Sequence, residues 1–336
     1  MYFNAREKII LRELSNNSRA SLSSMAKKTK CSYVTVGKVI EKLKEKIDLK
    51  FTLEIDLIKM GLLQRHILMI KFRDKPDHKW LESLLKEEKE VISAYLTQGQ
   101  FDLIVFAATS DPIKYVLWEF VLTQKLSSYG VLVKSSDLPY FSFGYLPLDN
   151  TVMEESKIDI SNDDKLLLRL LNENSRLSYS DLAKRMKSSE STIRYKLFNL
   201  VKKGIIKRFT IAVQKPPQLY TIGFFENWTS YTEKFEEKAA IERKITMSID
   251  EQMPVLTTFQ MSIPLSGSFG NFTMGLFDTE KDALENTIKK RKDIYRNEGY
   301  EERHAKILKP LKGMLPFRNL DIKENYNVVK WEQQHY

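Results

Sequence analysis

Residues 174–197 read NSRLSYSDLAKRMKSSESTIRYKL, and a looser version, NSRASLSSMAKKTKCSYVTVGKVI, occupies residues 17–40. Shifting the chain on itself by 157 residues aligns residues 8–50 with residues 165–207 without a gap. The aligned identities include Leu11/Leu168, Leu14/Leu171, Ser18/Ser175, Arg19/Arg176, Ala26/Ala183 and Ser32/Ser189. A shift this long indicates duplication of a whole unit, because solenoid repeats are about 20–50 residues long.

Each copy begins with the pattern of three short helices. In the second copy, leucines recur at helical spacing behind two aspartates, which favours a helix start. Ser178 and Asp181 resemble a capping box, Ser189 is expected to cap a third helix, and Gly204 can end it. Two short helices, a tight turn and a third amphipathic helix are typical of a helix-turn-helix.

The rest of each copy predicts the order βαββαβ, which is ferredoxin-like. In the first copy the strands are expected at residues 66–72, 91–97, 101–109 and 131–137, with helices at 76–88 and 111–130. In the second copy the strands are expected at residues 220–228, 255–263, 270–278 and 303–311, with helices at 231–249 and 281–299. The apolar runs that predict these strands are far too short to cross a bilayer.

The predicted fold class is α+β, with two repeats, each a winged-helix-like helix-turn-helix followed by a ferredoxin-like lobe. The predicted boundaries are residues 1–52 for the first helix-turn-helix, 53–149 for its lobe, 150–160 for a linker, 161–213 for the second helix-turn-helix, 214–322 for its lobe and 323–336 for a tail.

The chain has 336 residues and a formal charge of +10 at pH 7. Residues 1–50 and 161–210 each hold 12 Lys+Arg against 5 Asp+Glu, so together they carry +14 and the remaining 236 residues carry −4. A positive field confined to these two segments favours a polyanionic partner. Cys31 is the single cysteine, which excludes an internal disulfide. No pattern of a signal peptide is present, so we expect a cytoplasmic protein.

This arrangement resembles the Lrp/AsnC family of transcription regulators. The match is strongest over residues 163–213, where the family's acidic start, its N-x-R-x-S segment, its L-A pair, its serine-started recognition helix and its closing G-x-I all have counterparts. TQGQFDLIVF, at residues 97–106, resembles the family's glycine-turn segment. The resemblance implies a sequence-specific regulator that binds double-stranded DNA, with no catalytic activity and no cofactor.

A recognition helix places its N-terminal residues near base edges in the major groove. In the second copy, Arg194 can reach guanine bidentately, and Ser191 and Thr192 can bond bases or phosphates. Tyr195 can contact a phosphate or pack against a neighbouring domain. The expected backbone contacts of the second copy are Arg176, Lys184 and Arg185.

The first copy has Gly37 in the place of Arg194. We therefore expect the second copy to dominate specificity and the first to contribute mainly backbone contacts. The residues expected to make those contacts are Lys27, Lys28, Lys30, Thr35 and Lys38.

Family effectors, often amino acids, bind between sensing lobes near the glycine-turn segment, so the resemblance points to Gly99, Gln100 and Asp102 as effector contacts. Two lobes in one chain can pair internally, which makes the chain a pseudo-dimer, or between chains, which makes a homodimer. If the two lobes pair within one chain, the two diverged halves need not bind identical DNA half-sites, so we expect the target to be an imperfect palindrome.

Two other functions remain open. A helix-turn-helix can serve protein contacts alone. Sirohaem decarboxylases work as paired Lrp-like halves, and a fused pair would resemble this chain, with His66 and His304 beside a tetrapyrrole. Because the sequence has no P-loop, GxGxxG, GxSxG or metal-ligand spacing, we predict no catalytic residue and no metal site.

Overall fold

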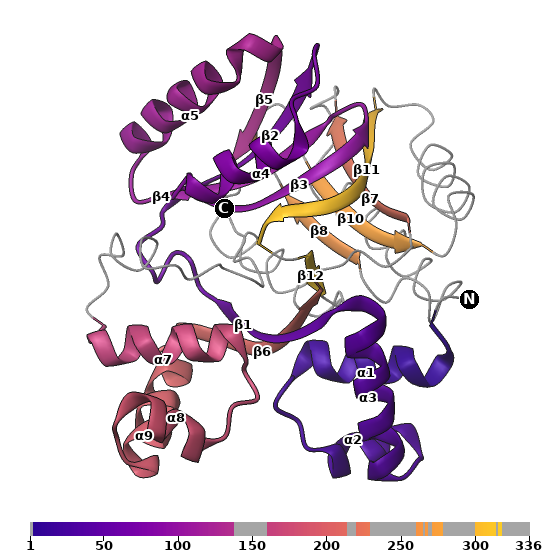
Figure 1. The fold of residues 1–336 in the computed structure, drawn as a ribbon, viewed down its shortest axis with the longest axis vertical. Helices are drawn as coiled ribbons and strands as arrows, with labels where there is room; N and C mark the ends of the chain where they lie inside the picture. The colour runs from indigo at the N-terminus through magenta and orange to yellow at the C-terminus, as the bar shows by residue number, and fades with distance from the viewer. Residues whose placement is uncertain are drawn as a thin grey trace.

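The computed structural model describes residues 3–137, 160–213, 220–228, 260–264, 266–267, 271–277, 300–313 and 315–317. The fold is α+β, as predicted. Two three-helix units lie side by side at one end, and a large sheet lies at the other (Figure 1). Among the described residues, no helix is long and apolar enough to cross a membrane.

The first unit consists of α1 (Ala5–Asn16), α2 (Leu22–Thr29) and α3 (Tyr33–Ile47), followed by β1 (Leu49–Ile55). The second consists of α7 (Asn162–Glu173), α8 (Tyr179–Met186) and α9 (Glu190–Lys202), followed by β6 (Ile206–Val213). Both units thus have the three short helices that the sequence pattern predicts, each followed by a strand.

The ends of these helices are set by their own residues. Ser178 and Ser189 are N-caps, and each hydroxyl accepts the N–H of the residue three positions on, which satisfies a donor without an intrahelical partner. The hydroxyl of Ser178 also donates to the carboxylate of Asp181 at 2.6 Å. Gly204 follows α9 with φ 68°, a left-handed conformation that favours glycine.

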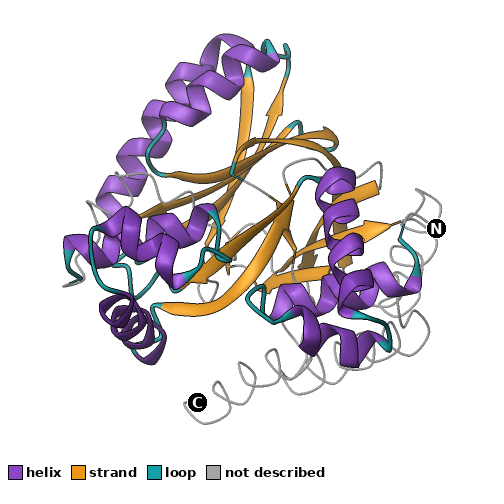
Figure 2. Cartoon of the chain, turned by 60° about the horizontal axis from the view of Figure 1, so that its bottom comes forward, coloured by secondary structure: helices purple, strands orange, loops and turns teal. Residues whose placement is uncertain are grey.

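The two units are joined by their strands. β1 pairs antiparallel with β6, from Leu49 opposite Val213 to Ile55 opposite Ile206, and β12 (Leu315–Phe317) adds to the far side of β6. Figure 2 shows the helices of the two units flanking this strand pair. The register fixes the position of one unit relative to the other.

The first lobe follows the predicted order. It comprises β2 (Gln64–Phe72), α4 (His78–Glu87), β3 (Val91–Gly99), β4 (Leu103–Thr109), α5 (Pro112–Leu126), a 3-10 turn (Ser127–Tyr129) and β5 (Val131–Asp137). Its strands are ordered β5-β2-β4-β3. Consecutive residues of β2 serve opposite faces: Ile67 and Met69 join the core beside β1 and β6, whereas Leu68 and Ile70 join the core under α4 and α5.

The second lobe contributes β7 (Tyr220–Trp228), β8 (Gln260–Pro264), β9 (Ser266–Gly267), β10 (Asn271–Phe277) and β11 (Tyr300–Lys312). β8, β10, β7 and β11 are neighbours in that order, and β11 then pairs with β3 of the first lobe. β9 pairs with β5 at the opposite end of the sheet. The helices predicted at 231–249 and 281–299, residues 150–159 of the predicted linker and the tail lie outside the described residues.

Candidate nucleic-acid interface

The recognition helix α9 divides its residues between core and solvent. Ile193, Leu197 and Leu200 are buried against α7 and α8. The opposite side is exposed and carries the polar set predicted to read DNA, together with two aromatic rings. Its members are Ser191, Thr192, Arg194, Tyr195 and Phe198.

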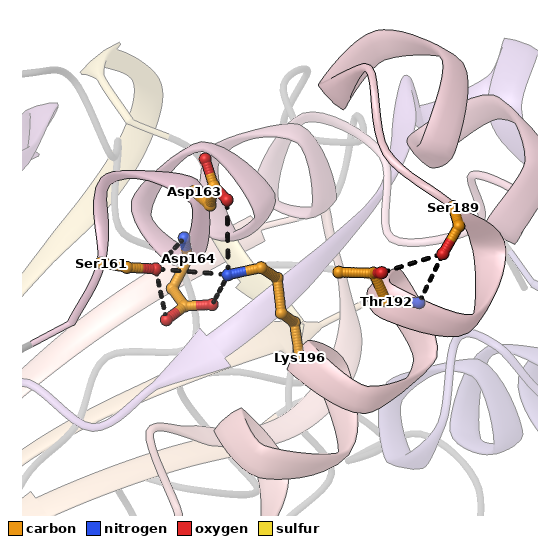
Figure 3. Close-up of polar contacts among 6 residues, drawn as sticks. All are labelled: Ser161, Asp163, Asp164, Ser189, Thr192 and Lys196. Atoms are coloured by element: carbon orange, nitrogen blue, oxygen red, sulfur yellow. Dashed lines mark hydrogen bonds and ion pairs between the residues drawn. The ribbon is translucent and has the colours of Figure 1, made fainter.

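α9 is anchored at two points (Figure 3). At its start, the Ser189 hydroxyl accepts the N–H of Thr192 at 3.1 Å. One turn later, the ammonium of Lys196 lies 3.5 Å from a carboxylate oxygen of Asp163 and 3.3 Å from one of Asp164. These carboxylates also suit the positive end of α7. The orientation of α9 is therefore fixed before any ligand binds.

Arg194 is held above a ring. Its guanidinium carbon lies 4.0 Å from the ring centroid of Tyr179, which begins α8, and its Nη2 lies 3.7 Å from a carboxylate oxygen of Glu190. The side chain remains 59% exposed, so its donors can still reach a base edge. The structure thus places the principal predicted base reader on the open side of α9 in a defined orientation.

The predicted backbone contacts of the second unit divide into two groups. Lys184 and Arg185 are exposed in the last turn of α8. Arg176 is not on that surface. Its Nε donates to the carbonyl of Ser18, its Nη2 donates to the carbonyl of Ala20 at 2.8 Å, and its guanidinium lies 4.7 Å from the ring centroid of Phe51. Arg176 therefore joins the two units through these contacts and lies apart from the exposed face of α8 and α9.

The predicted contacts of the first unit are mostly exposed. Lys27, Lys30 and Lys38 face solvent, and so does Lys28, although its ammonium pairs with Glu13. Thr35 is half-buried, and its N–H donates to the N-cap Ser32 at 3.1 Å.

Gly37 lies inside α3, as predicted, and a Cβ there would lie 3.8 Å from Cδ1 of Leu22. The exposed residues at the start of α3 are Tyr33 and Val34, at 60% and 50%. A base-reading cation is therefore absent from the place that Arg194 occupies in α9.

Sequence reasoning missed the residues that join the two units. The hydroxyls of Ser18 and Ser175 lie 2.6 Å apart although the residues are 157 positions apart. Arg19 donates through Nη1 to the carbonyls of Ser175 and Leu177, which mirrors the contacts of Arg176. The signal that could have revealed this junction was the identical N-S-R triplet in both copies.

Buried threonines reinforce the same junction. The hydroxyl of Thr52 in β1 donates to Asn172 in α7, and it lies 2.9 Å from both the carbonyl and the side-chain oxygen of that residue. The hydroxyl of Thr210 donates to the carbonyl of Ser15 at 2.8 Å. Ser15 and Asn172 are themselves 157 positions apart. The contacts between the units are therefore reciprocal.

The predicted effector residues are divided between two environments. Gly99 and Gln100 contact β11: the carbonyl of His304 lies 3.0 Å from where a Cβ of Gly99 would stand, and the side-chain oxygen of Gln100 accepts the N–H of His304 at 3.0 Å. Asp102 is buried, and its carboxylate accepts the N–H of Phe72 at 3.1 Å and pairs with Lys71 at 3.2 Å.

Asp102 lines a pocket of about 290 Å³, whereas Gly99 and Gln100 are not among its lining residues. Its other lining residues are Phe72, Lys75, Pro76, His78, Leu81, Leu96, Thr97, Gln98 and Leu308.

The two histidines named for a tetrapyrrole lie far apart. His66 of β2 is buried and stacked on Tyr115, with ring centroids 3.3 Å apart, and it is level with the Val91 end of β3. His304 of β11 lies beyond the Gly99 end of β3. At about 3.3 Å per residue the two ends are about 26 Å apart, so the histidines do not share one site.

Comparison with known proteins identifies the class of the second unit. Residues 164–207 match the family described as winged helix-turn-helix DNA-binding. An uncharacterized HTH-type transcriptional regulator of Pyrococcus horikoshii is 38% identical over 63 residues, which cover 19% of this chain and 40% of that protein. The regulator LysM of Sulfurisphaera tokodaii is 42% identical over 53 residues, which cover 16% and 38%.

The chain thus carries a DNA-binding helix-turn-helix of the kind found in transcription regulators. The resemblance to Lrp/AsnC-type regulators predicted from the sequence is confirmed. The match spans less than half the length of these two curated relatives.

A solved structure of the siroheme decarboxylase NirDL aligns with 98% of this chain and 100% of its own, with a TM-score of 0.53 and 15% sequence identity. At this identity the likeness extends to the fold alone.

Proposed function

We propose that this protein is a sequence-specific DNA-binding transcription regulator whose two helix-turn-helix units act together as a pseudo-dimer within one chain. The observation that carries the proposal is the exposed face of α9, where Arg194, Ser191 and Thr192 stand beside the cations of α8 on a DNA-binding winged helix-turn-helix. A specific bidentate arginine contact discriminates between bases by about 1–3 kcal/mol.

The internal pairing is supported by the reciprocal junction. Ser18 meets Ser175, and Arg19 and Arg176 each donate to backbone carbonyls of the opposite unit. In a symmetric dimer, equivalent residues meet across the axis, and here they do so within one chain. We read the chain as two diverged copies of one unit, with boundaries as predicted from the sequence, so its target would be an imperfect palindrome.

The test is fluorescence anisotropy of the full chain with duplex from its own upstream region and with scrambled duplex, over a series of salt concentrations. We expect tighter binding to the upstream duplex and a logarithm of affinity that falls steeply with the logarithm of salt. Failure to bind either duplex at low salt would refute the proposal and favour a helix-turn-helix used for protein contacts.

We further propose that a small molecule tunes this activity through the pocket beside Asp102. Apolar side chains line most of the pocket, which suits a ligand with an apolar body, and Asp102 there is paired with Lys71 and Lys75, so the polar end of the lining carries both signs of charge. Calorimetry with the twenty amino acids tests this, with Asp102→Asn as the variant expected to lose any binding found.

We also propose that two chains form a homodimer through α5. The outer face of α5 exposes apolar side chains at helical spacing, namely Ile113, Val116, Leu117, Phe120 and Val121. Contiguous exposed apolar surface of this kind is uncommon on monomers. Light scattering of the full chain and of a Leu117→Asp variant would show whether this face pairs two chains.

The fold likeness to NirDL is the observation that favours a second function, a tetrapyrrole-binding decarboxylase. The separation of His66 from His304 weighs against the single site suggested by the sequence, although each lobe could still bind by itself. Titration with an iron porphyrin tests this function. A saturable shift in its absorbance that His66→Ala or His304→Ala removes would support the enzyme over the regulator.

A further inference from the structure

A second pocket of about 290 Å³ opens where the two helix-turn-helix units meet. Four consecutive residues of the first unit, at the turn into α2, supply most of its lining, and the second unit supplies one arginine. The lining residues are Arg19, Ala20, Ser21, Leu22 and Arg176. The predicted base and effector contacts do not involve this pocket as a site.

Two positive charges face this pocket without a carboxylate between them. Among the described residues, no carboxylate lies within salt-bridge distance of Arg19 or Arg176. Burial lowers the pKa of both guanidinium groups, and the charge of Arg19 lowers the pKa of Arg176 further, while that of Glu41 opposes this. Arg176 donates to carbonyls through Nε and Nη2, so its Nη1 is left for another acceptor.

The start of α2 adds to the positive potential. Ser21 is the N-cap, and its hydroxyl accepts the N–H of Ser24 at 3.1 Å. The first N–H groups of a helix have no intrahelical acceptor, and the helix dipole makes this end positive. α2 therefore directs donors towards the pocket that the two arginines already make cationic.

The corresponding place on the other side of the junction is occupied by a ring. Tyr179 stands where the first unit has Leu22, and the guanidinium carbon of Arg19 lies 5.2 Å from its centroid. The smaller Leu22 leaves the space beside Arg176 open. The pocket is thus a consequence of one difference between the two copies.

We propose that this pocket binds a phosphate group, held by Arg176, Arg19 and the start of α2. The inference rests on the proposed function: both units line the pocket and both must face one duplex, so a backbone phosphate between the half-sites is the ligand that this function offers. The first helix of a helix-turn-helix commonly crosses the backbone, which suits this placement of α2. A phosphate monoester in solution offers the same chemistry.

The first arm of the test changes the DNA and leaves the protein intact. After a footprint has located the two half-sites, a neutral methylphosphonate replaces one phosphate at a time between them and, as a control, outside the footprint. We expect about tenfold weaker binding at one or more central positions, because charge-assisted hydrogen bonds are lost. The same substitutions outside the footprint should have no effect.

The second arm closes the pocket. Leu22→Tyr introduces the ring that the second unit carries at this position, and Ser23→Tyr introduces the same side chain at the next, exposed position. Leu22→Tyr should bind the unmodified duplex about tenfold more weakly and should be insensitive to the central methylphosphonates. Ser23→Tyr should retain the sensitivity of the natural chain.

A third arm distinguishes the source of the phosphate. Thermal unfolding of the full chain is followed in sodium phosphate and in sodium chloride at equal ionic strength. A higher Tm in phosphate, present in Ser23→Tyr and lost in Leu22→Tyr, would support a soluble phosphate ligand, whereas sensitivity to methylphosphonate alone would support the DNA backbone. If neither response is seen, the inference is wrong. If no duplex binds at all, the proposed function fails, and the phosphate arm alone decides this inference.

Discussion

Where α9 carries Arg194, α3 carries Gly37, and where α8 begins with Tyr179, α2 begins with Leu22. The two pairs occupy corresponding places in the two units. Arg194 lies over the ring of Tyr179 at 4.0 Å, and a Cβ on Gly37 would lie 3.8 Å from Leu22. The first unit therefore has the same helix packing but no counterpart of Arg194, the cation that we propose reads bases.

The anchoring of the recognition helix shows the same pattern. In the second unit Asp164 of α7 pairs with Lys196 of α9. Its equivalent in the first unit, Glu7 of α1, pairs with Lys42 and Lys46, one to two turns later along α3. Burial raises the pKa of Glu7, but the N–H of Asn4 and the two ammonium groups prevail and lower it. A different set of residues therefore holds α3 against α1.

The largest difference between the units should appear when each loses its main cation. Arg194→Ala should reduce the preference for the specific over the scrambled duplex by about 5- to 150-fold, because a bidentate contact discriminates by about 1–3 kcal/mol. Lys38→Ala should weaken binding to both duplexes alike and reduce the salt slope by about one. Anisotropy over a salt series measures both effects.

One outcome would contradict the ranking of the two units. If Arg194→Ala leaves the preference intact while Lys38→Ala removes it, the first unit reads the sequence and our ranking of the units is inverted. Circular dichroism of both variants would serve as the folding control, since both side chains are exposed.

The second prediction concerns the junction. Thr52→Val removes a buried hydroxyl that donates to Asn172 and should lower the free energy of unfolding by about 1–3 kcal/mol. Thr210→Val removes the reciprocal contact to Ser15 and should cost less, because only one acceptor lies near its hydroxyl. Urea unfolding of the full chain measures both. An unchanged midpoint for the two variants would mean that the junction adds nothing to stability and that the units are not held as one body.

The third prediction concerns the cost of the glycine in α3. Gly37→Ala should raise the free energy of unfolding by about 0.5–1 kcal/mol, because alanine is the better helix former and the new methyl meets Leu22 at an ordinary contact distance. Gly204→Ala is the control with the opposite sign, since φ there is +68° and a Cβ would lie 2.5 Å from Nζ of Lys59. Thermal unfolding distinguishes the two, and destabilisation by Gly37→Ala would show that α3 needs the glycine.

Much of this fold is encoded locally and could be predicted from the sequence. The cap residues Ser178 and Ser189 marked the starts of α8 and α9 in the sequence, and apolar runs marked the strands β2 and β4. The pairing of β11 with β3 was not predictable, because edge strands join through backbone groups that have no residue signature.

The candidate site could be predicted from the sequence only where the contacts of a residue lie within its own helix-turn-helix unit. The exposed face of α9 follows from helical periodicity, so Arg194 and Tyr195 were placed correctly on the open side of the helix. The contacts of Arg176 with the first unit were not predicted, because a repeated motif does not reveal which of its residues meet the other copy. Its burial against Ser18, Ala20 and Phe51 depends on the β1–β6 register, which only the folded chain displays.

The smallest expected effect tests how Arg194 is held. Tyr179→Leu, which gives the second unit the residue of the first, removes a cation–π contact worth about 0.5–1 kcal/mol at an exposed site. The preference for the specific duplex should fall by about 2- to 5-fold, because a freely rotating guanidinium is less well prepared for a bidentate contact. Binding to scrambled duplex should not change, whereas a general loss of structure would weaken both.

The decisive measurement is a double-mutant cycle. If Tyr179 acts by positioning Arg194, then Tyr179→Leu should have no further effect on preference in an Arg194→Ala background. An equal effect in both backgrounds would show instead that Tyr179 contributes through its other neighbour, Arg19, whose guanidinium carbon lies 5.2 Å from the centroid of the same ring. In that case the difference between the units would lie in how the junction is packed, and the loss of Arg194 from the first unit would be secondary to it.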